Sequence, residues 1–315
     1  MVTAFSPLSA LGALVLTSIA YKACSLVWLY TRPSNLHRYL HTTSGKPAWA
    51  LVTGATAGIG KALADELAAA GFNVVLHGRN TVKLDHVKAE LEKSHPAHEF
   101  RTLVVDAATS SEDPEKWLDK VVQLVDDLNL TVLVNNAGGG AQPVLSRLEE
   151  YSPARILGNV NLNAVFPTLL TSALIPVLLR NAPGLIINIG SFSDNGLPLV
   201  SFYGGAKTFT QTLMLSVNRE MTLENRDVEV IAHRVSRVTE TDHLKIKPTL
   251  FIPTARTAAK AILARTGCGK KSVISYWGHS ITQLGVNIIP DWLADRFLIN
   301  VMRNLRNEQD ATKTE

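Results

Sequence analysis

A glycine-rich turn between an apolar run and an amphipathic run constrains this chain more than any other feature. The turn reads TGATAGIG at residues 53–60 and directly follows an apolar run. Glycines at a strand-to-helix turn let the backbone approach a phosphate, and the helix start supplies unpaired N–H groups and a positive dipole end. An ordinary tight turn is the alternative. The turn predicts a dinucleotide site whose residues are Gly54, Thr56, Ala57, Gly58, Ile59 and Gly60.

Short apolar runs alternate with longer amphipathic runs from residue 48 onward. Nearly continuous apolar runs are typical of parallel strands buried on both faces. The expected strands are residues 48–53, 73–77, 102–106, 131–135, 185–189 and 228–232. Helical patterns between them include residues 58–70, 81–93, 114–128 and 202–223. This order predicts the α/β class, with a Rossmann-like, doubly wound parallel sheet in a single catalytic domain at residues 46–270.

Composition excludes several classes of protein. Apolar residues make up 46% and charged residues 18% of the 315 residues, which excludes a disordered chain. A net charge of +4 without a Lys/Arg block argues against a nucleic-acid partner. Cys24 and Cys268 stand far apart, without neighbouring Cys or His ligands. We therefore expect no disulfide and no metal site, and a reducing compartment.

The N-terminal segment, residues 1–45, has the pattern of a membrane anchor. Residues 8–30 carry a single charge, Lys22. A helix of that length reaches about 34 Å, slightly more than the ~30 Å of bilayer hydrocarbon. Three basic residues and no acidic residue follow within residues 31–46, which places the rest of the chain in the cytosol. We expect a single-pass helix and a basic linker; a buried or interfacial helix is the alternative.

The C-terminal segment, residues 271–315, is apolar and aromatic as far as residue 302. Pro290 interrupts it, so we do not expect one membrane-spanning helix there. Two interpretations stay open, a cap over a substrate cleft and a segment on the membrane surface. An ordinary packed terminal helix is a third.

The residues after the second expected strand bear on the choice of cofactor. They read Leu76-His77-Gly78-Arg79-Asn80, with no acidic residue to bind the ribose 2′-OH of NAD. Arg79 suits the 2′-phosphate of NADP, because a guanidinium group binds phosphate through several parallel hydrogen bonds. The sequence therefore predicts NADPH, with a solvated arginine as the alternative.

Two further strand ends extend the predicted nucleotide site. Asp106 and Ala107 follow the third strand, where a carboxylate can accept a hydrogen bond from the adenine amino group. Asn136, Ala137 and Gly138 follow the fourth and are small enough for the backbone to lie along the cofactor. The carboxyl ends of parallel strands share one edge of the sheet, so these residues outline one crevice.

Tyr203 and Lys207 form the candidate proton-transfer pair. Positions i and i+4 share one helix face, so the phenol and the ammonium point into the same cleft. A nearby ammonium lowers the pKa of a tyrosine from about 10. The phenol can then donate a proton to a carbonyl as hydride arrives, or accept one in reverse. A surface pair is the alternative for these two residues taken alone.

The motifs TGxxxGIG, NNAG and YxxxK, in this order, resemble the short-chain dehydrogenase/reductase family over about residues 46–240. The resemblance implies that Ser191 polarises the substrate carbonyl, with Ser193 as a second candidate. Ser191 precedes Tyr203 by twelve residues, one fewer than the commoner spacing of that family. The resemblance also implies that Lys207 binds the nicotinamide ribose.

The resemblance further implies an asparagine that holds a proton-relay water. Asn161 matches this position best, and Asn159 and Asn163 stay open as alternatives. After the sixth strand the family usually has Pro-Gly, whereas residues 233–238 read HRVSRV, so the implied nicotinamide contact of Val238 rests on position alone.

The anchor, the GSF after the fifth strand and a YWGH near the C-terminus narrow the resemblance. Together they are similar to the endoplasmic-reticulum 3-oxoacyl-CoA reductases of fatty-acid elongation and their microsomal 17β-hydroxysteroid dehydrogenase relatives. The C-terminal residues ATKTE lack the paired lysines of a dilysine retrieval signal. This departure and HRVSRV imply a divergent paralogue.

These observations predict a membrane-anchored, NADPH-dependent reductase of a lipophilic ketone. The substrate is a 3-oxoacyl-CoA or a polyketide-, terpenoid- or steroid-like ketone of specialised metabolism. The resemblance implies the endoplasmic reticulum. An NAD-dependent alcohol dehydrogenase and a non-catalytic nucleotide-binding scaffold are the alternatives. The oligomeric state stays open, a homodimer included.

Overall fold

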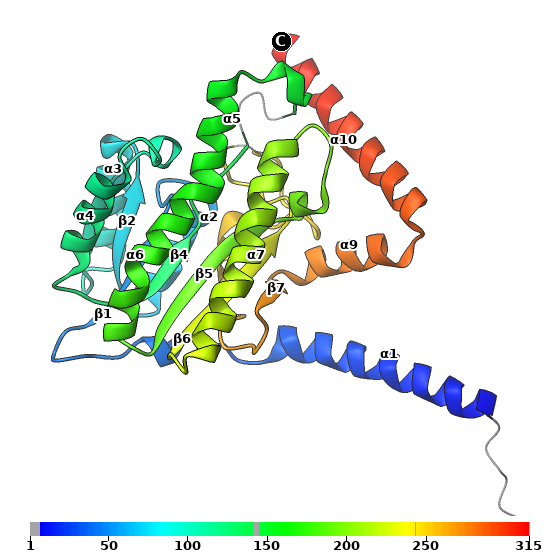
Figure 1. Ribbon diagram of the computed structural model, residues 1–315, viewed down its shortest axis with the longest axis horizontal. Helices are drawn as coiled ribbons and strands as arrows, with labels where there is room; N and C mark the ends of the chain where they lie inside the picture. Colours follow the sequence, from blue (N-terminus) through cyan, green and yellow to red (C-terminus); the bar gives the residue numbers. More distant parts are fainter. Residues whose placement is uncertain (1–6, 141–144, 243, 315) are drawn as a thin grey trace, which may run out of the picture.

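Seven parallel strands form one sheet in the order β3-β2-β1-β4-β5-β6-β7. The computed structural model describes residues 7–140, 145–242 and 244–314, with side chains described up to residue 310 (Figure 1). The strands are β1 Ala48–Val52, β2 Asn73–Gly78, β3 Phe100–Val104, β4 Asn129–Asn135, β5 Gly184–Ser191, β6 Val228–Val235 and β7 Ser272–Ile274. The strand order reverses between β1 and β4, which is where open α/β sheets bind ligands.

Helices cover both faces of the sheet, and each face has its own hydrophobic core. One core contains α2, α3 and α8, and the other contains α4, α6 and α7. Their bounds are α2 Gly58–Ala69, α3 Thr81–Ser94, α4 Pro114–Val125, α6 Phe166–Arg180, α7 Ser201–Leu223 and α8 Ala255–Leu263. The shorter elements are η1 Leu36–Tyr39, η2 Ala107–Thr109, η3 Leu148–Glu150, α5 Pro153–Val160, η4 Asn161–Val165 and η5 Phe192–Asn195. The predicted α/β fold and its doubly wound sheet are confirmed.

Two strands differ from the prediction. β3 lies two residues earlier, at Phe100–Val104, because the Asp106 side chain accepts a hydrogen bond from the Ala108 N–H and begins η2. β7 is a three-residue edge strand that hydropathy did not reveal. It lies within the segment assigned to a C-terminal cap, so the catalytic sheet continues past residue 270.

The N-terminal helix α1 (Pro7–Thr31) projects from the body (Figure 1). It is long and apolar enough to cross a membrane, and its most apolar stretch has no buried residue. A second helical stretch, Pro153–Arg180, passes the same test, but half of its apolar stretch is buried. That stretch includes α6, whose side chains pack in one of the two cores.

The last turn of α1 attaches the helix to the body. The Tyr30 hydroxyl donates a hydrogen bond to the Ile274 carbonyl at 2.7 Å, and the Arg265 guanidinium donates to the Leu29 carbonyl. Arg265 also lies 5.0 Å from the centre of the Tyr30 ring. The body end of α1 is therefore held by β7 and by the residues that follow α8.

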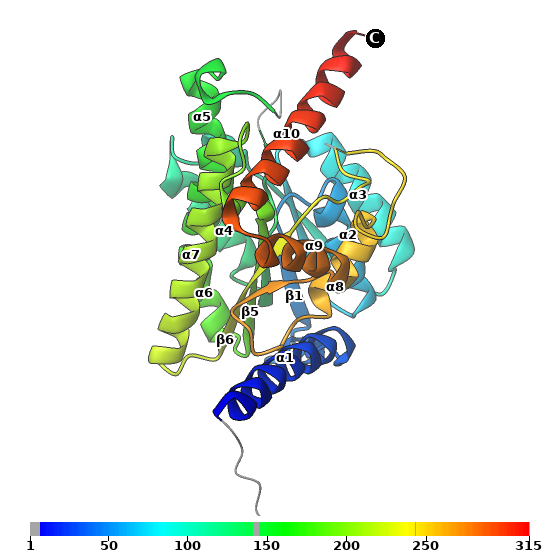
Figure 2. The same cartoon turned by 90° about the vertical axis from the view of Figure 1, so that its right-hand side faces the viewer.

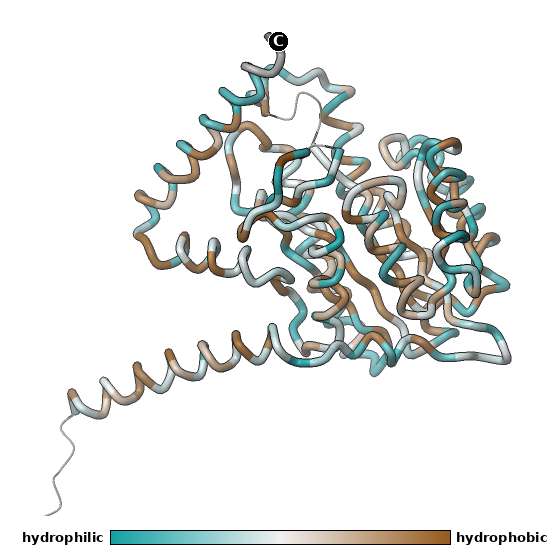
Figure 3. Tube along the Cα trace, turned by 180° about the vertical axis from the view of Figure 1, so that it is seen from behind, coloured by the Kyte–Doolittle hydropathy of each residue, from teal (hydrophilic) through white to brown (hydrophobic). Residues whose placement is uncertain are grey.

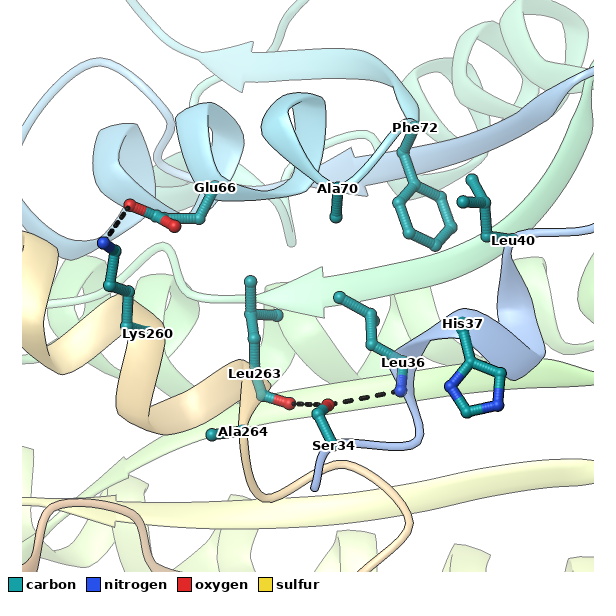
Figure 4. Close-up of a pocket in the computed structure, with 10 residues that line it drawn as sticks. All are labelled: Ser34, Leu36, His37, Leu40, Glu66, Ala70, Phe72, Lys260, Leu263 and Ala264. Atoms are coloured by element: carbon teal, nitrogen blue, oxygen red, sulfur yellow. Dashed lines mark hydrogen bonds and ion pairs between the residues drawn. The ribbon is translucent and has the colours of Figure 1, made fainter. Parts of the chain in front are cut away.

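The linker after α1 borders a pocket of about 370 Å³ between α2 and α8 (Figure 4). On one side of the pocket, the Ser34 hydroxyl donates to the Leu263 carbonyl at 2.6 Å. On the other, Glu66 and Lys260 form an ion pair at 3.8 Å. None of the predicted site residues lines this pocket.

The last two helices form an arm, α9 (Trp277–Ile288) followed by α10 (Asp291–Thr314), which we call the C-terminal arm. The break falls at Pro290, as the sequence indicated. Figures 1 and 2 show α9 leaving the body on the same side as α1, and α10 turning back toward the far end of the body. There Gln309 exchanges two hydrogen bonds with the Leu145 backbone, at 3.1 and 3.3 Å.

Candidate active site

The glycine-rich turn joins β1 to α2 at the point where the strand order reverses. Gly54 and Gly58 have φ of +66° and +53°, a left-handed backbone that residues with a Cβ rarely adopt. A Cβ on Gly60 would lie 2.2 Å from the Gly54 carbonyl oxygen. The third glycine therefore lets α2 pack directly on the turn.

The start of α2 fits a dinucleotide pyrophosphate. Its N-cap residue, Ala57, has an extended backbone and supplies no side-chain hydrogen bond to the first turn. The first N–H groups of α2 consequently have no side-chain acceptor, and they point toward an anion at the helix start. Thr241 approaches the same turn, since a Cβ on Gly58 would lie 3.2 Å from its methyl group. Sequence reasoning missed Thr241.

The NNAG residues join β4 to the turn. The Asn136 side chain donates to the Thr53 carbonyl at 2.9 Å. The Thr53 hydroxyl accepts from the backbone N–H groups of Asn136 and Ala137, at 2.8 and 2.9 Å. A Cβ on Gly54 would lie 2.9 Å from the Ala137 Cα. The Asn136 side chain thus supports the crevice, and the backbones of Ala137 and Gly54 lie close together.

Arg79 and Asp106 lie at the ends of β2 and β3 and are both exposed. Among the described residues, Arg79 has no recorded ion pair or side-chain hydrogen bond, so its guanidinium is available to a phosphate. The Asp106 carboxylate accepts from the Ala108 N–H at 3.0 Å, and Ala107 is buried in η2. Thr56 lies against β2, because a Cβ on Gly78 would be 2.9 Å from its methyl group.

His77 joins three strand ends behind the turn, and sequence reasoning missed it because it stands within an apolar run. Its Nδ1 accepts from the Gly54 N–H at 3.3 Å, so Nε2 carries the proton and donates to the Val105 carbonyl at 3.2 Å. Burial lowers the pKa of His77 to about 4. A neutral imidazole therefore holds the glycine turn against the end of β3.

Ser191, Ser193 and Tyr203 come together where β5 ends and α7 begins. The hydroxyls of Ser191 and Ser193 lie 2.7 Å apart, and both lie close enough to the Tyr203 phenol to act against the rise of its pKa that burial causes. The segment between β5 and α7 is one residue shorter than the family's commoner spacing, and Ser191 nevertheless reaches Tyr203.

Lys207 lies beneath Tyr203 on the same helix, as its spacing predicted. Its Nζ donates to the Ile189 carbonyl at 2.9 Å and lies 5.8 Å from the centre of the Tyr203 ring. Burial lowers the pKa of Lys207 to about 8, and burial raises the pKa of Tyr203. The expected lowering of the Tyr203 pKa is not seen, because the loss of solvent around the phenol raises the pKa more than Ser191 and Ser193 lower it.

The structure places Asn163, rather than Asn161, beside Lys207. The Asn161 side chain donates to the Ala108 carbonyl at 3.0 Å, on the η2 side. The Asn163 side chain accepts from the Gly139 N–H at 3.1 Å and donates to its carbonyl at 3.0 Å. A Cβ on Gly138 would lie 2.7 Å from Asn163 Oδ1 and 2.9 Å from Lys207 Nζ.

Both asparagines lie in η4, which is a single π-helical turn over Asn161–Val165. A π-turn inserts an extra residue into a helix and shifts the faces on either side of it. The third candidate, Asn159, donates to the Gly139 carbonyl at 2.8 Å and so supports the same loop.

The model of the short chain dehydrogenase family matches residues 48–247, which is more than half of the chain. This chain is a member of the short-chain dehydrogenase/reductase family. A very-long-chain 3-oxoacyl-CoA reductase of Pyricularia oryzae is 29% identical over 88% of this chain and 82% of that protein. A very-long-chain 3-oxoacyl-CoA reductase-like protein of Arabidopsis thaliana is 30% identical over 88% of this chain and 87% of that protein.

The solved structures agree with the family assignment. A metagenomic short-chain oxidoreductase in complex with NADP is 26% identical, with a TM-score of 0.58, over 72% of this chain and 96% of that chain. The family uses a nicotinamide cofactor, and this short-chain dehydrogenase/reductase is accordingly an oxidoreductase.

The segment after β6 in this family member is held by the YWGH motif. His279 of that motif accepts from the Ser236 N–H at 3.3 Å through Nδ1, and its Nε2 lies 3.2 Å from the Arg237 carbonyl. Burial lowers the pKa of His279 to about 4. Val238 follows and is buried in the core. Its contact with the nicotinamide stays a prediction.

An ion pair holds η5, which carries Ser193, against β6. Arg234 donates to both carboxylate oxygens of Asp194, at 2.7 and 2.6 Å, and to the Asn195 side chain at 3.0 Å. Arg234 occupies part of HRVSRV, where the family usually continues to Pro-Gly. Arg234, which belongs to this departure from the family pattern, therefore holds the segment that carries Ser193 against β6.

Proposed function

We propose that this protein reduces the 3-oxo group of a long-chain acyl-CoA with NADPH. Two kinds of observation support the substrate class and the cofactor. Relatives about 30% identical over most of their length carry the name very-long-chain 3-oxoacyl-CoA reductase. Arg79 stands exposed at the end of β2, where the dinucleotide-binding fold places the 2′-phosphate of NADP.

The cluster at the end of β5 carries the proposal. Ser191 lies beside the Tyr203 phenol, and Lys207 lies below the same ring. One substrate oxygen can therefore accept hydrogen bonds from the serine and tyrosine hydroxyls together. That arrangement stabilises the negative charge that develops on a carbonyl oxygen during reduction.

The turn at Gly54 and Gly58 would hold the pyrophosphate of NADPH and Arg79 its 2′-phosphate, and the cofactor, when bound, would supply a hydride for the carbonyl carbon. Ser191 donates a hydrogen bond to the carbonyl oxygen, and Tyr203 transfers its phenolic proton to that oxygen. Lys207 would bind the nicotinamide ribose and, when protonated, stabilises the phenolate that Tyr203 becomes.

Asn163 completes the proposed proton path. Its side chain holds Gly139, and its Oδ1 and Lys207 Nζ both lie next to Gly138. A water in this position would accept hydrogen bonds from Lys207 and return a proton toward Tyr203. We therefore assign the relay role to Asn163 in place of Asn161.

We further propose that α1 anchors the enzyme in the endoplasmic-reticulum membrane, with the catalytic domain in the cytosol. The apolar exposed surface of α1 supports the anchor, and the basic residues Arg32 and Arg38 beyond it support the orientation. The membrane itself is proposed from the resemblance alone. The oligomeric state stays an open prediction.

The test is turnover by the full-length protein in detergent or microsomes. NADPH oxidation is followed with 3-oxoacyl-CoA substrates of increasing chain length and with steroid-like and polyketide-like ketones, and NADH is compared in parallel. We expect the long 3-oxoacyl-CoA substrates to give the highest kcat/KM. Turnover of the polycyclic ketones alone would instead favour a role in specialised metabolism. Nucleotide binding without turnover of any ketone would contradict the proposal.

A further inference from the structure

We propose that the corner between α9 and α10 inserts into the leaflet from which α1 emerges, so that the catalytic cleft opens toward the bilayer. We call the residues Leu284–Phe297 the membrane corner. The inference rests on the proposed function only in taking α1 to lie in the membrane. Its partner is a phospholipid surface.

The first observation is an apolar stripe along the outer side of α9. Trp277, Ile281, Leu284 and Ile288 are exposed by 38%, 48%, 51% and 72% of their surface. Their spacings of four, three and four residues place them on one face of the helix. All four side chains are exposed large apolar groups of the described part of the chain.

The stripe continues past Pro290 onto α10. Four more large apolar side chains are 40–63% exposed there, namely Trp292, Leu293, Phe297 and Ile299. Figure 3 shows hydrophobic colour at the corner and along α1, both on the same side of the body. A contiguous apolar patch of this kind marks an interaction surface, whereas scattered apolar residues do not.

The second observation is the attachment of α9 to α1. The Tyr30 hydroxyl, at the body end of α1, is hydrogen-bonded to the Ile274 carbonyl just before α9 and to the Ser280 hydroxyl within it. Figures 1 and 2 show the two helices leaving this point on the same side. A bilayer that contains α1 therefore faces α9 as well.

The length of α9 and the charges beside the corner limit the depth of insertion. The 12 residues of α9 reach about 18 Å, so the corner can reach at most about the middle of the bilayer. Asp291 and Arg296 at the start of α10 favour the boundary between headgroups and acyl chains over the bilayer centre. Interfacial helices bury their apolar face about 5–10 Å into that boundary.

The third observation is that the C-terminal arm contacts η5, the segment that carries Ser193. Gln283 of α9 accepts a hydrogen bond from Asn195 of η5 at 3.3 Å, two residues after Ser193. At its far end, α10 pairs Arg306 with Glu150 of η3 at 3.5 Å. The arm thus connects the membrane corner with η5 and η3.

This placement favours a bilayer over a second copy of the chain as the partner. The patch lies on the same side of the body as α1, which is long and apolar enough to span a bilayer. It also carries Trp277 at the start of α9 and Trp292 at the start of α10, and tryptophans are enriched at membrane interfaces. It follows that the apolar chain of a substrate can stay in the leaflet while its oxo group reaches Tyr203.

The experiment measures tryptophan quenching in the full-length protein reconstituted into phosphatidylcholine vesicles. One variant, Trp28→Phe/Trp277→Phe, keeps Trp292 as its sole exposed tryptophan. A second variant, Trp277→Phe/Trp292→Phe, keeps Trp28 of α1. A third lacks Trp28, Trp277 and Trp292 and reports the background from Trp49 and Trp117, which are 2% and 9% exposed. Each is compared in vesicles without and with a spin-labelled phosphatidylcholine.

We expect the Trp292 emission to fall in spin-labelled vesicles, and to fall more when the label is near the headgroup than near the chain end. Equal Trp292 emission with and without either label, while Trp28 is quenched, would overturn the inference and leave the proposed anchor standing. Quenching of Trp292 without quenching of Trp28 would support the corner and refute the spanning helix. Quenching of neither would refute both.

A matched pair of substitutions separates a bilayer from a second copy of the chain. Ile288→Asp adds charge to the corner, and Val82→Asp adds charge to an equally exposed apolar position on α3, with 72% and 78% exposure. Ile288→Asp should reduce the quenching of Trp292, whereas Val82→Asp should not. A dimer that Ile288→Asp dissociates, with Trp292 unquenched in the parent, would assign the corner to a protein interface and overturn the inference.

Discussion

Lys207 Nζ donates a hydrogen bond to the Ile189 carbonyl at 2.9 Å, two residues before Ser191 on the same strand. The strand that presents the serine thus also holds the ammonium of α7. Because the lysine is buried and its pKa is lowered to about 8, its protonation is sensitive to any change in this contact. The catalytic groups of β5 and α7 are consequently positioned as one unit.

The first prediction concerns the proton donor. Tyr203→Phe removes one hydroxyl and keeps the ring, so we expect turnover to fall by ~10²–10⁴-fold while NADPH affinity changes little. Steady-state kinetics and fluorescence titration with NADPH measure the two effects. A variant that keeps more than about a tenth of the parent rate is incompatible with this general-acid role.

The second prediction concerns cofactor choice. Arg79→Asp removes a phosphate partner and adds like charge, so NADPH affinity should fall about ten- to a hundredfold. NADH affinity, measured in the same titration, should not fall with it. Asp106→Asn serves as a control, because that residue is assigned to the adenine side. An unchanged ratio of NADPH to NADH affinity in Arg79→Asp would contradict the assignment of Arg79 to the 2′-phosphate.

The third prediction separates the two asparagines. Asn163→Ala should lower kcat, because its side chain supports Gly139 beside Lys207. Asn161→Ala should leave kcat close to the parent value, because its side chain binds the Ala108 carbonyl instead. Thermal denaturation of both variants controls for folding. A larger loss of kcat in Asn161→Ala than in Asn163→Ala would instead assign the relay role to Asn161.

The fourth prediction is a loss of stability in mild acid caused by His77. Its pKa is about 4 in the folded protein and about 6.5 when unfolded, so the unfolded chain binds more protons between these values. The free energy of unfolding therefore falls as pH drops from about 6.5 toward 4, and this residue contributes about 2 kcal/mol of the loss at pH 5. Denaturant titrations at pH 7 and 5 measure it.

The variant His77→Gln tests the cause of that pH dependence. Glutamine does not titrate, so the difference in unfolding free energy between pH 7 and 5 should shrink, whatever the variant costs at pH 7. His86→Gln, a substitution of an exposed histidine on α3, is the control and should keep the parent pH dependence. An equal pH dependence in the parent and in His77→Gln would assign the effect to other groups.

The fifth prediction concerns the anchor and its direction. Deletion of residues 1–31 should release much of the protein from microsomes, and less completely if the membrane corner also adheres. The full-length protein should resist a carbonate wash, and its catalytic domain should be digested by protease added to sealed microsomes. Extraction by carbonate would argue against a spanning helix. Protection from protease until detergent is added would reverse the orientation.

Patterns that depend on burial or on helix spacing were sufficient to predict most of the fold and to bring Ser191, Tyr203 and Lys207 together. Continuous apolar runs identified six strands because both faces of the sheet are covered. The i, i+4 spacing placed Lys207 below Tyr203, and the strand-end position placed Ser191 beside it.

Features that depend on backbone irregularity or on desolvation were not accessible from spacing. Asn161 was preferred to Asn163 because it matches the family's position best, and the position in a motif does not record that the Asn163 side chain is the one beside Lys207. β7 is too short to leave a hydropathy pattern. The direction of the Tyr203 pKa shift depends on how completely the phenol is buried, which no motif records.

The π-helical turn at Asn161–Val165 changes the direction of the side chains that precede it relative to those that follow it in the same long helix. Removing one residue from it would restore regular α-helical winding and rotate the preceding side chains by about 100° relative to those that follow. Either the core face of α6, which includes Phe166 and Leu170, or the asparagine beside Lys207 would then turn away from its partners. The extra residue of the π-turn thus lets one helix present both its core face and Asn163 in the observed directions. We therefore expect a one-residue deletion in this turn to disturb the structure more than many substitutions there would.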